Sequence, residues 1–422
     1  MLLGDVLRGI PFLCFTFHCL RVSVSSSIIV RTSRLTFRLF YASINYYRAE
    51  ARFIYPEDIM SFQLPTFTPP NFNSEQFMNS PDAKHSKVVK DGVAPCGFYL
   101  TSHLPTYYKL NGKWVLPQRS SLNCAAIIKN DTVVIKELRD LTIGEEVILA
   151  EVSDGSEGVF KSSGLFDKSV MQTAGKAVET SFTGDYNFLY ELMKHEKETG
   201  GYIVWVMGPS VVFDHDTRVA LSNLARAGYV NALLAGNALA THDLEGGYLN
   251  TALGQNIYTQ ESVPMGHYNH LDLLNEVRRA GSIKNFIAEG HVKNGFIKTI
   301  TELNIPIVLA GSIRDDGPLP EVYQKVTEAL TAMKAQTDKA TLIICLATML
   351  HSVSTANLAS SYRIAADGSV LPVYMYTVDV TENVTNKISA ARENIAVRSI
   401  VTNVQDFVVN VQNALVPAAA IK

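Results

Sequence analysis

The chain has 422 residues, 47% of them hydrophobic, and a formal net charge of -3 from 37 basic and 40 acidic residues. This length is enough for two or three domains with their own cores. Nucleic acid is not an expected partner, because the charges are balanced and no basic stripe with interleaved aromatic residues is present. Five cysteines without a Cys-x-x-Cys pair indicate a reducing compartment.

Residues 1–60 differ in composition from the rest of the chain. They hold seven arginines and no lysine, and Asp5 is the only acid before Glu50. Such a segment is typical of a mitochondrial transit peptide, and the alternative is that Met60 is the true start. The apolar run 10–17 is too short to span a bilayer, so no membrane association is expected. A secretory signal fits less well because no disulfide pattern follows. We therefore expect a cytoplasmic or mitochondrial protein.

The next two segments are predicted from turn residues and short apolar runs. Residues 61–94 are rich in proline and weakly periodic, which predicts an extended linker. Residues 95–165 predict a small β domain, in which Asn111-Gly112 is the strongest hairpin signal. Nothing in this domain is catalytic by residue type. The expected strands of the β domain are 106–110, 114–116, 125–129, 132–135 and 146–150.

Residues 175–415 predict an α/β domain. A helical pattern over 176–199 ends at Gly200-Gly201, and apolar strands then alternate with helices. Continuous apolar strands separated by helices imply a doubly wound, Rossmann-like parallel sheet covered on both faces. The first turn reads Gly208-Pro209-Ser210, without the G-x-G-x-x-G of most dehydrogenases. The expected strands are 202–207, 231–235, 306–310, 341–346, 373–378 and 397–401. The expected helices are 214–227, 268–280, 284–289, 294–303, 319–335, 381–392 and 404–414.

Small, polar or charged residues follow four of these strands. In a parallel α/β sheet, ligands bind at the carboxyl ends of the strands, so the four segments predict one cleft. An acid that closes a strand, such as Asp379, often holds the hydroxyls of an adenosine ribose; the alternative is a helix N-cap. Solvated surface loops are the alternative for the other segments. The four segments are 236–238, 311–316, 347–352 and Asp379.

Several other residues are candidates by type. His351 is a possible proton shuttle, or a helix-start histidine satisfied by the backbone. Arg314 is suited to bind a carboxylate through two parallel hydrogen bonds. Two histidine groups, His242 with Asp243 and His267 with His270, lack a third metal ligand, so no metal site is expected.

Five stretches of the chain resemble a known family. The resemblance covers residues 92–413 and is to the NAD-dependent ornithine cyclodeaminases of the archaeal type, also called the LOR/SDH bifunctional enzyme conserved domain. The same unit forms the C-terminal part of the cyanobacterial arginine dihydrolase/ornithine cyclodeaminase, and its nucleotide domain is similar to that of deoxyhypusine synthase. The stretches are GNALATHD (236–243), GHYNHLDLLNEVRRAGSI (266–283), VLAGSIRDDGPLP (308–320), LATMLHS (346–352) and APCGFYLTSHLPTYYKLNGKWV (94–115).

The resemblance implies NAD as cofactor, ornithine as substrate and a homo-oligomer. Three departures stand out: the family usually has an aspartate at the position of Asn403, the stretch 363–372 is longer, and 61–91 matches no upstream domain of the family. We therefore expect no arginine-degrading activity. The NAD contacts implied by the resemblance are Asn237, Ala238, Asp316, Thr348, Met349, Leu350, His351, Asp379, Asn403 and Val404.

The implied reaction converts L-ornithine to L-proline and ammonia. NAD removes a hydride from Cα, the δ-amine attacks the imine, ammonia leaves, and the hydride returns to the cyclic imine. From residue type we hypothesise Asp315 or His351 as the acid/base and Arg314 as a clamp for the carboxylate. Two alternatives are another NAD-dependent amino-acid oxidoreductase and a catalytically silent NAD-binding protein.

Overall fold

The structure, a computed structural model, describes residues 62–162, 184–313, 315, 317–392 and 395–418. The expected leader 1–60 and the candidate residues Arg314 and Asp316 lie outside this part. Contacts group Phe62–Lys422 into one unit. Across the described residues, no helix has the length and apolar character needed to cross a membrane.

The N-terminal part of this unit contains two antiparallel sheets. One has the order β1-β6-β4-β5 and the other β3-β2-β7. The turn Asn111-Gly112 joins β2 and β3, and both residues have positive φ, 49° and 75°, so the predicted hairpin is present. Part of the stretch expected to be a linker contributes α2 (Glu75–Met78) and the edge strand β1 (Lys84–Lys87). The other strands are β2 (Thr106–Leu110), β3 (Lys113–Val115), β4 (Ala125–Lys129), β5 (Thr132–Lys136), β6 (Glu146–Leu149) and β7 (Val159–Lys161), with the short helix η1 (Leu138–Asp140).

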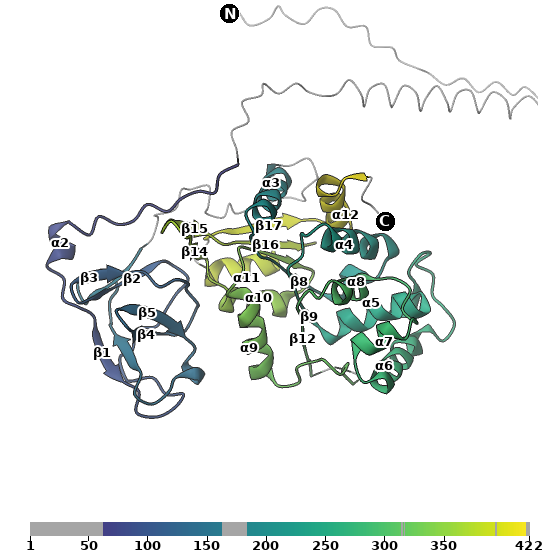
Figure 1. Ribbon diagram of the computed structural model, residues 1–422, viewed down its shortest axis with the longest axis horizontal. Coiled ribbons are helices and arrows are strands. Elements are labelled where there is room, and N and C mark those ends of the chain that lie inside the picture. The colour runs from purple at the N-terminus through teal and green to yellow at the C-terminus, as the bar shows by residue number, and fades with distance from the viewer. Residues whose placement is uncertain (1–61, 163–183, 314, 316, 393–394, 419–422) are drawn as a thin grey trace, which may run out of the picture. The chain divides into compact units, whose positions relative to one another are not determined.

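The larger part is built on a six-stranded sheet whose paired strands all run parallel (Figure 1). Its spatial order is β12-β9-β8-β13-β16-β17. Numbered along the chain, this is the Rossmann order 3-2-1-4-5-6, which reverses direction between β8 and β13. The predicted doubly wound sheet is therefore confirmed. Its strands are β8 (Ile203–Met207), β9 (Ala232–Gly236), β12 (Ile307–Ala310), β13 (Leu342–Leu346), β16 (Tyr374–Asp379) and β17 (Val397–Val401).

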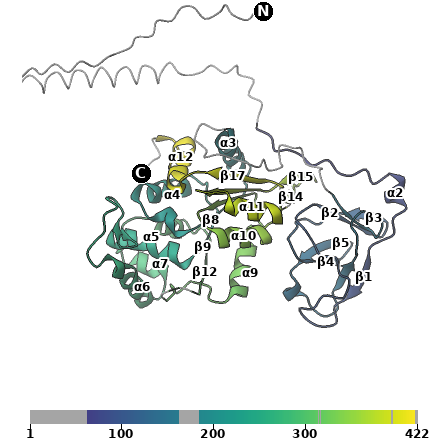
Figure 2. The ribbon, with the colours of Figure 1, turned by 180° about the vertical axis from the view of Figure 1, so that it is seen from behind.

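Helices cover both faces of the sheet, as the two views in Figures 1 and 2 show. Alternate residues of β8 belong to different buried clusters: Trp205 packs with α4 and α12, whereas Val204 packs with α9 and α10. The helices are α3 (Gly184–Glu198), α4 (His215–Arg226), α5 (Asn237–Leu249), α6 (Asn269–Ala280), α7 (Ile283–Ala288), α8 (Phe296–Glu302), α9 (Val326–Thr337), α10 (Met349–Leu358), α11 (Asn383–Ala391) and α12 (Val404–Leu415). Short elements are η3 (Pro209–Val212), η4 (Gly266–Tyr268) and the strands β10 (Thr251–Ala252), β11 (Gln255–Asn256), β14 (Tyr362–Ile364) and β15 (Val370–Pro372).

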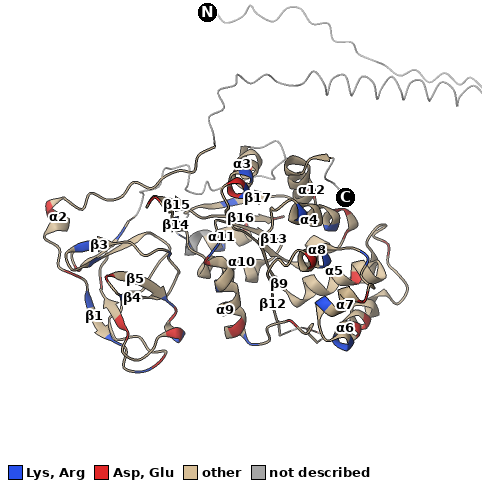
Figure 3. Cartoon of the chain, in the orientation of Figure 1, with Lys and Arg blue, Asp and Glu red and all other residues tan. Residues whose placement is uncertain are grey.

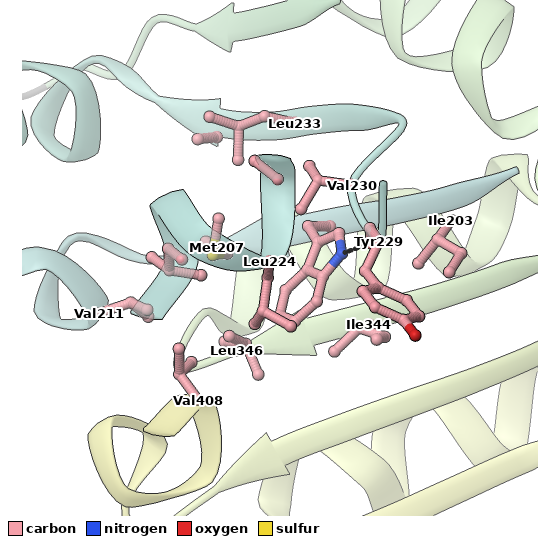
Figure 4. Packing of buried hydrophobic residues seen from close by; sticks show 14 of the residues in the cluster. Ile203, Met207, Val211, Leu224, Tyr229, Val230, Leu233, Ile344, Leu346 and Val408 are labelled. Atoms are coloured by element: carbon pink, nitrogen blue, oxygen red, sulfur yellow. Dashed lines mark hydrogen bonds between the residues drawn. The ribbon is translucent and has the colours of Figure 1, made fainter. Parts of the chain in front are cut away.

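Apolar side chains from β8, β9, β13, α4 and α12 form the core beside the central strands (Figure 4). Trp205 is fully buried there, and its indole N–H donates a 2.8 Å hydrogen bond to the Tyr229 carbonyl. Four of the six strands, β8, β9, β12 and β13, contain no charged residue, and the charges lie mostly on surrounding helices and loops (Figure 3). Such a sheet is a rigid platform for the loops that follow its strands.

The structure corrects three expectations about the helices. The sequence pattern did not predict α5 or α10. Helix α5 lacks an amphipathic stripe because buried polar residues and two glycines interrupt its apolar positions. The helix expected at 319–335 begins only at Val326.

The stretch before α9 instead covers the edge of the sheet. Tyr323 N–H donates to the Leu309 carbonyl at 2.8 Å, and Gly311 N–H donates to the Tyr323 carbonyl at 2.9 Å. Tyr323 thus forms a parallel bridge with Ala310 of β12. Pairing of this kind satisfies backbone groups of an edge strand, which a helix at the same place would leave open.

Candidate active site

The strand register places the polar segments predicted from the sequence along one edge of the sheet. Gly236 of β9 lies opposite Ala310 of β12, and Met207 of β8 lies opposite Leu346 of β13. On the other side, Leu346 lies opposite Val378 of β16. The loops after β9, β8, β12, β13 and β16 therefore begin side by side, where a Rossmann sheet binds its ligand.

At the centre of this edge, the loops after β8 and β13 are in direct contact. Gly208 N–H donates to the Leu346 carbonyl at 2.9 Å. A Cβ at residue 208 would lie 2.1 Å from the Ala347 carbonyl oxygen, so only glycine fits there. Ala347 has a positive φ of 46°. This close approach occurs at the point where the strand order reverses.

Three of the helices that follow strands of this edge, α5, α10 and α11, begin without a side-chain cap. Gly236, which precedes α5, has no side chain to act as a cap, and the side chain of Thr348, which precedes α10, accepts no hydrogen bond from that helix. The first backbone N–H groups of a helix have no partner inside the helix and attract anions such as phosphate. By contrast, Asp214 caps α4 and Asn403 caps α12. The starts of α5 and α10 coincide with two stretches that the resemblance assigns to NAD.

Asn237 and Asp315 both make hydrogen bonds to the loop after β12. The Asn237 side-chain oxygen accepts from the Leu319 N–H at 3.0 Å, and Asn237 is buried. The Asp315 carboxylate accepts from the Ser312 N–H at 2.9 Å. Asp315 thus stabilises its own loop. The Asp315 carboxylate also places a negative charge beside the end of β12.

His351 lies against the end of β9. A Cβ on Gly236 would be 3.3 Å from the His351 Cε1 atom, so the imidazole reaches across from α10 to the start of α5. Burial lowers the pKa of His351, which favours the neutral ring near pH 7. The neighbouring Met349 and Leu350 are exposed. Thr348 is half-buried, and its carbonyl accepts a hydrogen bond from Ser352.

The remaining predicted contacts lie at the ends of β16, β17 and β9. Asp379 Oδ1 accepts from the Val380 N–H at 2.7 Å, while Oδ2 has no hydrogen-bond partner within the described part of the chain. The Asn403 side chain accepts from two backbone N–H groups of α12, at 2.8 and 3.4 Å. Val404 is buried in the core, and Ala238 is exposed. The stretch 363–372 forms the hairpin of β14 and β15.

The pair His242-Asp243 divides between two separate networks on α5. Asp243 accepts from Arg218 Nε at 2.8 Å and from the N–H groups of Phe296 and Ile297, so it holds the start of α8. His242 contacts Glu245 instead: Nδ1 lies 2.8 Å from Oε2. Sequence reasoning considered this histidine only as a metal ligand. No group of three metal-ligating side chains occurs among the residues that the structure describes.

The fold defines a class: an α/β protein with the Rossmann strand order, a class in which ligands bind at the carboxyl ends of the strands. The family model described as "Arginine dihydrolase ArgZ-like, C-terminal, Rossmann fold" matches residues 189–411. The chain belongs to this family, the one that also includes archaeal ornithine cyclodeaminases.

Three similar proteins illustrate this membership. Ornithine cyclodeaminase of Methanocaldococcus jannaschii is 38% identical over 285 residues, which are 65% of this chain and 66% of that enzyme. The bifunctional arginine dihydrolase/ornithine cyclodeaminase AgrE of Nostoc sp. is 33% identical over 77% of this chain and 46% of its own length. The crystal structure of a LOR/SDH protein from Methanococcus maripaludis S2 has a TM-score of 0.68 and 30% identity, covering 79% of this chain and 98% of that one. The chain thus matches slightly less than two thirds of the first enzyme and about half of the second.

Proposed function

We propose that the chain is an ornithine cyclodeaminase, which converts L-ornithine to L-proline and ammonia by an internal redox reaction with bound NAD. The observation that carries the proposal is the 38% identity to an archaeal enzyme of that name. The described edge is compatible with it, because a Rossmann switch point and two uncapped helix starts favour a dinucleotide.

The ligand classes are supported by AgrE, which has been crystallised as a ternary complex with ornithine and NAD+. The 33% sequence identity between AgrE and this chain supports the same pair of ligands here.

The chain's residues suit the parts of a dinucleotide. The open N–H groups at the starts of α5 and α10 would bind the phosphates, next to Asn237, Ala238 and the run Thr348 to His351. Asp379 Oδ2 would accept a hydrogen bond from a ribose hydroxyl. Asp316, Asn403 and Val404 complete the proposed contacts; because the Asn403 side chain caps α12, its contribution would come through the backbone.

The substrate has two amines and one carboxylate, which need acids and a cation. When bound, NAD supplies a nicotinamide that accepts the Cα hydride and returns it after cyclisation. We retain Arg314 as the proposed carboxylate clamp and His351 or Asp315 as the acid/base. The neutral imidazole of His351 fits a base, whereas the hydrogen bond from Ser312 fits Asp315 to a role in holding the loop.

The proposal is tested by incubating the full chain with ornithine and NAD and measuring proline, ammonia and NADH. We expect equal amounts of proline and ammonia without NADH accumulation. Ornithine-dependent accumulation of NADH would instead indicate an ordinary amino-acid oxidoreductase. NAD binding without ammonia release would indicate a catalytically silent NAD-binding protein. Turnover that survives both Asp315→Asn and His351→Ala would contradict the acid/base assignment.

Two further proposals follow from the resemblance. We propose that the chain forms a homo-oligomer, which analytical ultracentrifugation tests; a monomer at micromolar concentration would contradict it. We also propose a cytoplasmic or mitochondrial location, which imaging of the tagged full chain tests. Location in the secretory pathway would contradict that proposal.

A further inference from the structure

The His242–Glu245 pair has the geometry of a proton-transfer dyad. His242 Nδ1 lies 2.8 Å from Glu245 Oε2, and the Glu245 side chain is fully buried. The other oxygen, Oε1, accepts from Thr251 Oγ1 at 2.7 Å. Both carboxylate oxygens are therefore fixed, and the carboxylate in turn fixes the orientation of the imidazole. This is how an acid orients a histidine that works as a general base.

A second contact fixes the dyad from the side of α6. Asn269 Nδ2 donates to Thr251 Oγ1 at 2.7 Å, so the chain of hydrogen bonds runs from α6 through β10 to Glu245 and then to His242. His242 Nε2, at the end of this chain, has no hydrogen-bond partner among the described residues. The His242 side chain is 9% exposed, whereas both ring nitrogens of His103 are buried without a hydrogen-bond partner.

The position of His242 brings it to the edge of the sheet that carries the candidate site. It lies on α5, the helix that starts at Asn237 directly after β9. Its ring centroid is 5.6 Å from that of Phe213, in the segment that follows β8 and η3. On the α6 side its ring centroid is 6.1 Å from that of His270. The His242 ring, on the helix that follows β9, therefore contacts both the segment that follows β8 and helix α6.

We propose that His242 is a catalytic proton-transfer group of this site, with Glu245 as its positioning residue. The inference rests on the proposed cyclodeamination. That reaction needs a group that carries a proton between two substrate nitrogens. His242 Nε2 removes a proton from the attacking δ-nitrogen of ornithine and delivers one to the departing α-nitrogen. The C–N bond to the δ-nitrogen forms, the C–N bond to the α-nitrogen breaks, and the electron pair leaves with ammonia, so no proton is gained or lost overall.

The dyad is tested with His242→Ala and Glu245→Gln, and with His291→Ala as a matched control that removes an exposed imidazole. We expect kcat to fall by a factor on the order of 10²–10⁴ in His242→Ala, with KM for ornithine and calorimetric NAD affinity changed less than about threefold. Added imidazole should restore part of the His242→Ala rate. Glu245→Gln should lower kcat with thermal stability and NAD affinity close to wild type, and imidazole should not restore it.

A binding measurement separates contact with the substrate from a structural role. In protein labelled with ¹³C-histidine, the signal absent from His242→Ala belongs to His242, and we expect this signal to shift on addition of proline, the product. An unmoved signal together with near-normal kcat in both variants would overturn the proposal. If the wild type itself forms no proline from ornithine, the proposed function fails instead.

Discussion

Two neighbouring residues of α5 show how differently polar side chains are used in this fold. Asp243 lies in a saturated network with Arg218, and both side chains are buried, at 0% and 1% exposure. His242, one residue earlier, ends a hydrogen-bond chain at a nitrogen without a partner among the described residues. The first arrangement holds helices together, whereas the second leaves one position for a ligand. The same contrast separates the enclosed interior from the carboxyl edge of the sheet.

The largest effect is expected in the saturated network. Asp243→Asn leaves the Arg218 guanidinium buried without a counter-charge and weakens the two hydrogen bonds at the start of α8. Breaking a buried pair in this way costs about 3–5 kcal/mol of unfolding free energy. Urea denaturation measures the loss, with the exposed Asp272→Asn as control. A variant that unfolds at the wild-type urea concentration would show that the pair is not structural.

A buried histidine of the interior, His103, should make the stability of the fold depend on pH. Burial, aided by the nearby Arg392, lowers the pKa of His103 from 6.5 to about 3. The unfolded chain therefore binds a proton in this range that the folded chain does not, and stability is lost as the pH falls below 6.5. Between pH 6.5 and 4 the loss is about 3 kcal/mol. We expect His103→Leu to flatten this part of the pH–stability curve; an equally steep curve in the variant would assign the effect to other groups.

At the edge, a histidine should affect the ligand more than the fold. His351→Ala removes an imidazole that lies against Gly236, and we expect calorimetric affinity for NAD to fall about tenfold, or about 1.4 kcal/mol. The urea midpoint should change less than the NAD affinity, because the imidazole is only half-buried and makes no hydrogen bond within the described part of the chain. Loss of stability with unchanged NAD affinity would show that His351 stabilises the fold and does not contact the cofactor.

The smallest effect is expected at Asn403, which caps a helix and is also a proposed NAD contact. Asn403→Ala removes the cap of α12 and should cost about 1 kcal/mol of stability. Asn403→Asp introduces the aspartate that the resemblance leads us to expect at this position, and an aspartate caps a helix as well as asparagine does. We expect this variant to match the wild type in the urea midpoint and in NAD affinity within about threefold. A larger gain in affinity would mean that the side chain contacts the cofactor directly.

The sequence predicted the sheet well because its strands are continuous apolar runs, and the residues after them mark the carboxyl edge. It did not predict α5, where Gly246 and Gly247 make room for the Arg218 side chain and the Asn294 carbonyl. Those contacts join segments far apart in the chain. The sequence indicated His242 and Asp243 together as possible metal ligands because they are adjacent in the chain. Their hydrogen-bond partners, Glu245 and Arg218, place them in separate networks. Tyr323 is not helical as expected, because its backbone N–H and carbonyl form hydrogen bonds with the edge strand β12 and the residue after it.

In the proposed cyclodeamination, oxidation and reduction occur on one substrate molecule with one bound cofactor. The most direct test is turnover of ornithine deuterated at Cα, with unlabelled NAD, and mass spectrometry of the proline formed. If the proposed function is correct, the proline retains deuterium at Cα and no reduced cofactor is released. Proline without deuterium, or deuterium accumulating in free NADH, would contradict it.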